Sequence, residues 1–173
     1  MTLLEIDIQY ISLAVSLIGL AFIVLLLTSF KKLRLEIVQK SRINIEGNNL
    51  KLQSLERLTL YAERSGLKNL VERTGNKGMS TADLHHILID TLKTEFEYNQ
   101  SQQIYVSPEV WNAITRLKDQ NIYIINHITA NLPPYATAMD LSRLIIEYSI
   151  TPNAELNTIV LDALQFEAKK ILS

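Results

Sequence analysis

The chain has 173 residues, of which 47% are hydrophobic and 20% are charged, with a formal net charge of −1 at pH 7 and no cysteine. This length allows one modest domain, and the near-neutral charge argues against a general nucleic-acid binder, which would carry a basic face. The lack of cysteine excludes disulfides, thiolate zinc sites and cysteine nucleophiles.

An uncharged stretch of 23 residues runs from Ile8 to Phe30. As a helix it would be about 34 Å long, enough to cross a hydrocarbon core of ~30 Å. A cleaved signal peptide would need a basic N-terminal region, a shorter apolar run and a small-residue cleavage site, and none of these is present. The charged side chains ahead of the stretch are the acids Glu5 and Asp7, so the positive-inside rule predicts an outside N-terminus and a cytoplasmic C-terminal part. The basic residues that follow the stretch are Lys31, Lys32, Arg34, Lys40 and Arg42.

Small residues line one side of this predicted transmembrane helix. Ser12, Ser16 and Gly19 follow one another at steps of four and three. Such a surface lets transmembrane helices approach closely, although similar stripes also arise by chance. These three residues are therefore the candidates for a contact within the membrane.

The segment after the span, residues 31–49, is predicted to be a basic juxtamembrane stalk. It is expected to continue the helix until Gly47, Asn48 and Asn49 end it. Its basic residues either only fix the topology or also attract anionic lipid headgroups. The predicted organisation is an N-terminal tail and anchor at 1–30, this stalk at 31–49, and a cytoplasmic helical domain at 50–173.

From Leu50 onward, apolar residues recur at helical spacing, and no strand-length alternating run competes with them. A first helix is expected to stop at Ser65 and Gly66, before a short second one. The next three are expected to begin at N-cap pairs, Ser80 with Asp83, Ser107 with Pro108 and Thr137 with Asp140, and Thr151 with Pro152 is expected to open the last. The predicted fold is all-α, a transmembrane helix followed by a cytoplasmic bundle of about five helices.

One predicted helix carries a heptad-like apolar stripe that contains a single amide, Asn121. A buried Asn in such a stripe tends to fix the register of helix packing at some expense of stability. The stripe consists of Val110, Ile114, Leu117, Asn121, Ile124 and Ile128.

Between two of these helices lies an amide-rich connection, residues 99–107, which we call the joint. A helix that ends inside a bundle leaves carbonyls unsatisfied, and amides can both donate and accept hydrogen bonds. One interpretation is that such bonds hold the joint together, with Asn99 and Gln103 turned inward. Residues 104–106 are then a short extended link, Ile104 and Val106 fill the core, and Trp111 packs over it. The other interpretation is a surface that recognises a partner. The residues assigned to the structural role are Asn99, Gln102, Gln103, Ser107 and Trp111.

The remaining polar clusters are weak signals for chemistry. Glu95 and Glu97 diverge on a helix, so they are expected to be solvated and not a catalytic pair. Asp83, His86 and Asp90 are spaced for a helix face, but one Asp-x-x-His motif is too little for a helical metal site, and the adjacent His85 points elsewhere. The loop GNKGMS at 75–80 is read as a capped loop in preference to a phosphate site. We therefore assign no catalytic residue, no cofactor and no metal.

Two segments, SLERLTLYAERSGLKNLVER at 54–73 and EFEYNQSQQIYVSPEVW at 95–111, follow the span and stalk. In these features the chain resembles an uncharacterised family of small single-pass membrane proteins from Bacteroidota, a domain of unknown function. The resemblance covers roughly residues 8–125. It implies a bacterial inner-membrane setting and transfers no catalytic residue.

The sequence thus predicts a membrane-anchored cytoplasmic helical module that acts through protein contacts, as an accessory or scaffold subunit of an inner-membrane complex. Its expected partners are the lipid bilayer and a protein or a second copy of itself, and not nucleic acid. Two alternatives stay open: a self-associating membrane protein, and an enzyme or small-ligand sensor whose pocket lies near Asn99, Gln103, Trp111 and Asn121. The candidate partner-binding residues are Tyr98, Gln100, Tyr105 and Glu109.

Overall fold

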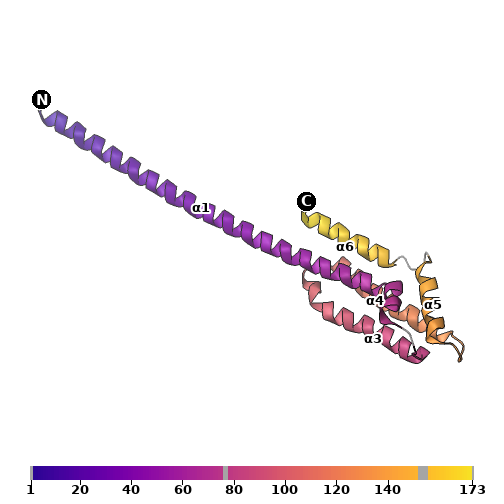
Figure 1. Cartoon of the computed structure of the whole chain (residues 1–173). Helices are drawn as coiled ribbons and strands as arrows, with labels where there is room; N and C mark the ends of the chain where they lie inside the picture. The colour runs from indigo at the N-terminus through magenta and orange to yellow at the C-terminus, as the bar shows by residue number, and fades with distance from the viewer. Residues whose placement is uncertain (1, 76–77, 152–155, 173) are drawn as a thin grey trace. The chain divides into compact units, whose positions relative to one another are not determined.

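The computed structural model describes residues 2–75, 78–151 and 156–172, with side chains from residue 10 onward except that of residue 14 (Figure 1). Every regular element in these residues is helical, which confirms the all-α prediction. The chain divides into two compact units, Met1–Gly47 and Asn48–Ser173. The elements are α1 (Thr2–Ser65), α2 (Leu67–Thr74), α3 (Thr81–Asn99), the 3₁₀ helix η1 (Gln100–Ile104), α4 (Pro108–Ala130), α5 (Ala138–Ser149) and α6 (Leu156–Leu172).

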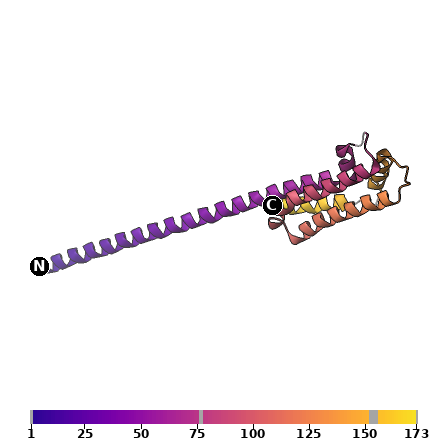
Figure 2. The same cartoon turned by 90° about the horizontal axis from the view of Figure 1, so that it is seen from below.

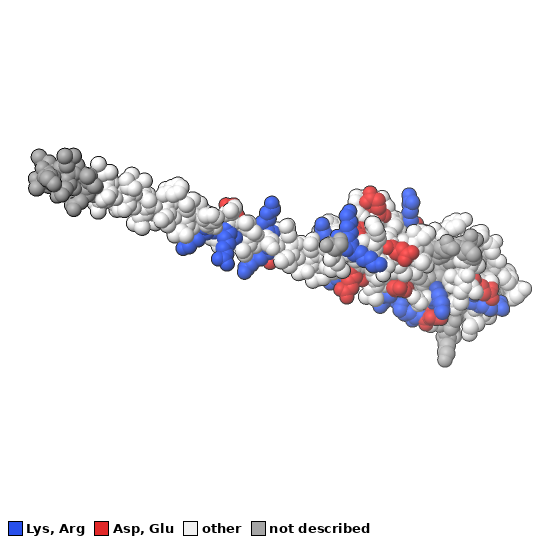
Figure 3. All heavy atoms as spheres, turned by 90° about the horizontal axis from the view of Figure 1, so that it is seen from above, with Lys and Arg blue, Asp and Glu red and all other residues white. Residues whose placement is uncertain are grey.

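The first unit consists of the N-terminal part of α1, which contains a stretch long and apolar enough to cross a membrane. Its mean hydropathy reaches 2.7, and none of that stretch is buried within the chain. Figure 3 shows it as an uncharged surface followed by a band of Lys and Arg side chains. The stretch thus meets the requirements for a membrane span in length and in composition.

The predicted end of the helix at Gly47 is wrong, because α1 continues through Gly47, Asn48 and Asn49 to Ser65. A glycine inside a helix costs about 1 kcal/mol relative to alanine, which shortens a marginal helix but does not stop a long one. Helix propagation is favourable once a nucleus exists, and here helical residues stand on both sides. The expectation that Gly47, Asn48 and Asn49 end the helix therefore overestimated how strongly these residues disfavour helical structure.

The helices of the second unit (Figure 2) form two apolar clusters. One cluster joins the end of α1 with the first half of α4 and with α6, through residues such as Leu58, Ile114 and Leu164. The other joins α2, α3 and α5 with the second half of α4, through residues such as Leu88 and Ile125. Because α4 contributes to both clusters, its predicted stripe is the link between them, and all of it is buried except Ile128, which is partly so.

Three of the predicted helix starts are confirmed by hydrogen bonds at the caps. Ser80 with Asp83 and Thr137 with Asp140 form complete capping boxes, and the Ser107 side chain accepts a bond from the N–H of Val110. The Ser80 hydroxyl and its main-chain N–H lower the pKa of Asp83, and the same two groups of Thr137 lower that of Asp140. The predicted start at Thr151 and Pro152 extends outside the described residues.

Candidate functional site

The joint begins where α3 ends, and two of its amides form the bonds expected of a structural role. Asn99 Nδ2 donates to the main-chain oxygen of Glu95 at 2.8 Å, one turn earlier in α3. Gln102 is 8% exposed, and its Oε1 accepts from the Ser54 hydroxyl of α1 at 2.9 Å. Its Nε2 donates to Ser101 Oγ at 3.1 Å. Gln102 therefore fastens the joint to α1.

Two further predictions for the joint are wrong, because Gln103 is exposed and Ile104 is 73% exposed. The predicted extended link is instead the helix η1, which contains Ile104. A 3₁₀ helix has 3.0 residues per turn, so the inward face of α3 continues to the third residue after Asn99, which is Gln102. The α-helical spacing had placed Gln103 on that face.

Ser107, at the end of the joint, is held by a carboxylate that is distant in sequence. Glu167 of α6 accepts from the Ser107 N–H at 3.0 Å through Oε1, and from the Ser107 hydroxyl at 2.8 Å through Oε2. The same hydroxyl accepts from the Val110 N–H at 3.3 Å. A negative charge at the start of α4 is also favoured by the helix dipole. The sequence analysis did not identify Glu167 as the partner of Ser107. The sequence offers only the general rule that a helix N-terminus attracts a carboxylate, and this rule does not say which carboxylate it is.

Three aromatic rings pack together next to the joint. Trp111 stacks on Phe96 with ring centroids 5.3 Å apart, and Phe96 meets the edge of Tyr61 at 6.1 Å. The Lys118 ammonium lies 4.4 Å from the Phe96 ring centroid. These contacts join Trp111 to α3, and Trp111 packs against the same apolar cluster as Val106 of the joint.

Tyr61 is almost completely buried on α1, and so is Ser65. Among the described residues, neither hydroxyl has a partner of standard hydrogen-bond geometry. Burial raises the pKa of Tyr61 from its ordinary 10.0 to about 12, and the charges of Glu95 and Asp119 also raise it, while the Ser65 hydroxyl offsets part of the increase. A buried phenol without a firm partner disfavours the ionised form.

Glu95 is an ion-pair centre and not the solvated residue that the sequence predicted. Its Oε1 lies 2.9 Å from an Arg64 nitrogen of α1 and 2.8 Å from an Arg73 nitrogen of α2. Its side chain is 19% exposed. Glu97, in contrast, is exposed, so the two carboxylates do not act together.

Beside Glu95 lies a groove of about 480 Å³ between α1 and α3, which we call the α1/α3 groove. Its apolar part includes the exposed side chains of Leu60 and Tyr98. Arg57 supplies positive charge along one side, while Arg64, which also lines the groove, is paired with Glu95. The groove can therefore accept an apolar group that is flanked by a carboxylate.

The four candidate partner-binding residues do not all border one hollow. Tyr98 lines the α1/α3 groove, while Glu109 lines a separate hollow between α4 and α6. Gln100 is exposed and Tyr105 is half-buried. Of the four, Tyr98 has the clearest setting for a contact.

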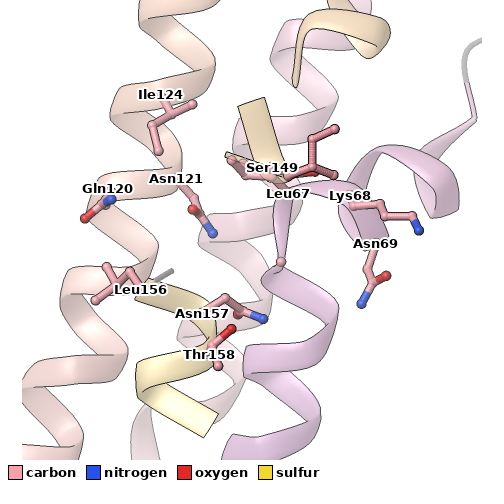
Figure 4. A pocket seen from close by; sticks show the side chains of 12 residues that line it. Leu67, Lys68, Asn69, Gln120, Asn121, Ile124, Ser149, Leu156, Asn157 and Thr158 are labelled. Carbon is pink, nitrogen blue, oxygen red and sulfur yellow. The ribbon is translucent and has the colours of Figure 1, made fainter. Parts of the chain in front are cut away.

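Another hollow, of about 190 Å³, lies at the bend between α1 and α2 and is rich in amides (Figure 4). Asn121 of α4 donates through Nδ2 to the Ser65 main-chain oxygen at 2.8 Å. Asn157 of α6 has a buried Oδ1 with no hydrogen-bond partner among the described residues. Gly66 leaves room here, since a Cβ on it would lie 3.3 Å from Asn157 Nδ2. We call this space the amide cavity.

The comparison with protein families bears on the whole chain. A family model described as a family of unknown function, DUF7935, matches residues 2–171. The chain belongs to DUF7935. No curated protein and no solved structure matches it.

In this DUF7935 chain the ligand pocket predicted from sequence does not form as expected. Of the four residues Asn99, Gln103, Trp111 and Asn121, only Asn121 lines the amide cavity. The other amides there are Asn69, Gln120 and Asn157, of which Asn69 donates to the Glu63 main-chain oxygen at 2.9 Å. Periodicity could not indicate them, because they come from three different helices.

Two polar side chains near the start of α3 have contacts other than a metal in the DUF7935 fold. His85 Nε2 lies 2.7 Å from Asn126 Oδ1 on α4, and Asp83 is engaged in the cap of α3. Within the part of the chain that the structure describes, no group of three or more His, Cys, Asp or Glu is arranged to hold a metal ion. The loop at 75–80 falls partly outside the described residues.

The small residues of the predicted span lie on the exposed surface of α1. Ser12, Ser16 and Gly19 are all exposed, and Ser16 Oγ donates to the Leu13 main-chain oxygen at 2.9 Å. A Cβ added to Gly19 would meet no atom within 4 Å. The surface is thus open to a neighbouring helix.

Proposed function

We propose that this DUF7935 protein is a helical interaction module anchored in a bacterial inner membrane by one span, and that it acts as an accessory or scaffold subunit of a complex there. The observation that carries the proposal is the apolar stretch of α1 from Tyr10 to Phe30, whose described large apolar side chains are all exposed. Exposed apolar surface of this extent requires a nonpolar environment. A bilayer supplies one, and the helix satisfies its own backbone hydrogen bonds.

The orientation in this proposal rests on charge. Basic residues follow the apolar stretch, and the two residues Glu5 and Asp7 precede it. The positive-inside rule then puts the unit Asn48–Ser173 in the cytoplasm and the N-terminus outside. The resemblance to a Bacteroidota family supports the bacterial setting.

The role as an interaction module is supported by an exposed groove next to the joint. Within the joint, Asn99 and Gln102 bond to neighbouring backbone or side-chain groups, which fits a structural role for it. The α1/α3 groove offers exposed Leu60 and Tyr98 beside the arginines, a surface suited to a partner. The partner segment is proposed to carry an apolar residue and a nearby acid.

The topology is tested by cysteine labelling, for which the cysteine-free chain is well suited. Thr2→Cys and Tyr135→Cys each introduce a single thiol, and Tyr135 is highly exposed. On intact spheroplasts a membrane-impermeant maleimide should label Thr2→Cys and spare Tyr135→Cys until the membrane is opened. Equal labelling of both before opening, or release of the protein by alkaline carbonate, would contradict the anchor.

The partner is tested by purification of the tagged chain from its own membranes at native level, followed by mass spectrometry. A membrane protein recovered at stoichiometric yield supports the accessory-subunit role. Recovery of the chain alone, in a detergent that preserves known complexes of the same membrane, counts against it.

A small-ligand sensor is the second candidate, and the amide cavity is the observation that favours it. The unpartnered Asn157 Oδ1 calls for an N–H or O–H donor, since an unbonded buried acceptor is destabilising. The volume of about 190 Å³ is below that of common drug-sized pockets, so the ligand would be small and polar. A thermal-shift series with free amino acids and small amides tests this, with Asn157→Leu expected to abolish a shift that Asn126→Leu retains. Equal shifts in both variants would place the ligand elsewhere.

A further inference from the structure

Apolar side chains continue on α1 beyond the stretch that a membrane would cover. In the segment 31–47, which also holds the basic residues, six large apolar side chains are exposed. They have no cover from the described part of the same unit, and such residues mark a contact surface where they line up on one face of the helix. They are Leu33, Leu35, Ile37, Val38, Ile43 and Ile45.

Two of these side chains extend a regular spacing that begins inside the span. The residues Ile23, Leu26, Phe30, Leu33 and Ile37 alternate at steps of three and four, and all five are exposed. This is the heptad spacing that keeps one helix face against a partner helix. We call this face of α1 the seam.

The seam also continues toward the N-terminus in the same register. Gly19, Ser16 and Ser12 precede Ile23 at steps of four, three and four. Small residues at these positions let two backbones come close where packing drives association in a bilayer. The small-residue stripe and the apolar stalk residues are therefore parts of one face, although either alone would say little.

The residue types of the seam select the kind of partner. Ile23, Phe30 and Ile37 fall at a positions of the heptad, so two of these three are β-branched, and Leu26 and Leu33 fall at d positions. β-branched residues at a with leucine at d favour a parallel pair of helices. Lys40 occupies the next d position, and this charged residue ends the tightly packed part of the seam. Asn44 occupies the a position after it, where an asparagine fixes the register of a helix pair.

We propose that two copies of this chain pair in parallel through the seam, from Ser12 to Ile37, in the membrane and in the juxtamembrane segment. This rests on the proposed membrane anchoring, since two copies inserted with the same topology hold equivalent residues at equal depth. The seam then faces its own counterpart in register, as a heptad requires. In a parallel pair of copies in register, every a and d position faces the same residue of the other chain, so that Asn44 at a faces Asn44.

Disulfide cross-linking of full-length single-cysteine variants in isolated native membranes tests the pairing. Leu33→Cys and Ile37→Cys lie on the seam, whereas Leu35→Cys lies at the outward f position of the same heptad and is the matched control. Under mild oxidation the two seam variants should form dimers of twice the chain mass at least about ten-fold faster than Leu35→Cys. Equal rates for all three, or a cross-linked product whose second chain is another protein, would overturn the proposal.

A second readout does not depend on cysteine geometry. In liposomes, energy transfer between copies labelled at Tyr135→Cys should fall when Ile37→Ala is added and stay unchanged with Leu35→Ala. No effect of either change, with transfer at the level of random proximity, also counts against the seam. The maleimide labelling at Thr2→Cys reports the topology separately, so a correctly inserted but monomeric chain refutes the pairing alone, and a misplaced N-terminus refutes the anchor.

Discussion

Asn121 Nδ2 donates a 2.8 Å hydrogen bond to the main-chain oxygen of Ser65, and both residues lie buried where the two apolar clusters of the second unit meet. Ser65 is the last residue of α1, so its carbonyl has no partner within the helix. The Asn121 amide supplies that partner from the middle of α4. The bond therefore allows α1 to end in the core, immediately before the bend at Gly66.

Replacement of Asn121 by leucine should lower the free energy of unfolding by about 1–3 kcal/mol, because it leaves the Ser65 carbonyl buried without a donor. Trp111 is the single tryptophan and reports unfolding by its fluorescence. Asn112→Leu is the matched control, since Asn112 is exposed on the same helix, and it should change stability by no more than about 0.5 kcal/mol. Equal effects of both changes would show that the bond to Ser65 contributes little.

The joint yields a paired prediction for two neighbouring glutamines. Gln102→Leu removes one acceptor of the buried Ser54 hydroxyl, which keeps the Leu50 main-chain oxygen at 3.0 Å, and we expect a loss of about 0.5–1.5 kcal/mol in the free energy of unfolding. Gln103→Leu changes an exposed side chain and should be nearly neutral. Urea unfolding of the two variants compares them directly. A larger loss for Gln103→Leu would mean that the inward face continues with α-helical and not 3₁₀ spacing.

This pair also shows where sequence reasoning succeeds and where it stops. The capping boxes and the stripe of α4 were predictable because each depends on residues within one or two turns. Gln102 was assigned to the joint, but the inward face was extended to Gln103 because the helix changes its period at Gln100, and no residue there signals the change. The contacts of Glu167 and Asn157 were missed because they join segments far apart in the chain.

The bonds between Ser107 and Glu167 predict a measurable coupling between α4 and α6. Glu167→Gln should destabilise the protein by about 1–2 kcal/mol, since a carboxylate that accepts two bonds at a helix N-terminus is lost. In a double-mutant cycle with Ser107→Ala, the two changes should be non-additive by about 1 kcal/mol. Glu97→Gln, on an exposed residue, serves as the control. Strict additivity would show that the two side chains do not stabilise each other.

Tyr61 predicts a loss of stability at high pH. Its pKa is raised from 10.0 to about 12 in the folded chain, so the folded state binds the phenol proton more tightly than the unfolded state. The resulting stabilisation is fully present below pH 10 and is lost as the pH rises toward 12, by at most about 2–3 kcal/mol. Unfolding measured at pH 8, 10 and 11 should show this slope, and Tyr61→Phe should flatten it. Tyr61→Phe should also leave stability at pH 8 unchanged or higher, because it removes an unpartnered buried hydroxyl.

Tyr98 predicts the effect on partner binding, and Tyr135 provides the control. Both tyrosines are largely exposed, 77% and 86%, but only Tyr98 lines the α1/α3 groove. Exposed aromatic side chains beside a groove are frequent binding hot spots, so Tyr98→Ala should reduce the partner that co-purifies with the chain by about ten-fold or more. Its unfolding free energy should change by less than about 0.5 kcal/mol, because little packing is lost. Tyr135→Ala should leave both quantities unchanged. If Tyr98→Ala retains the full partner yield, the contact lies on another face, and Glu109 in the hollow between α4 and α6 becomes the next residue to change.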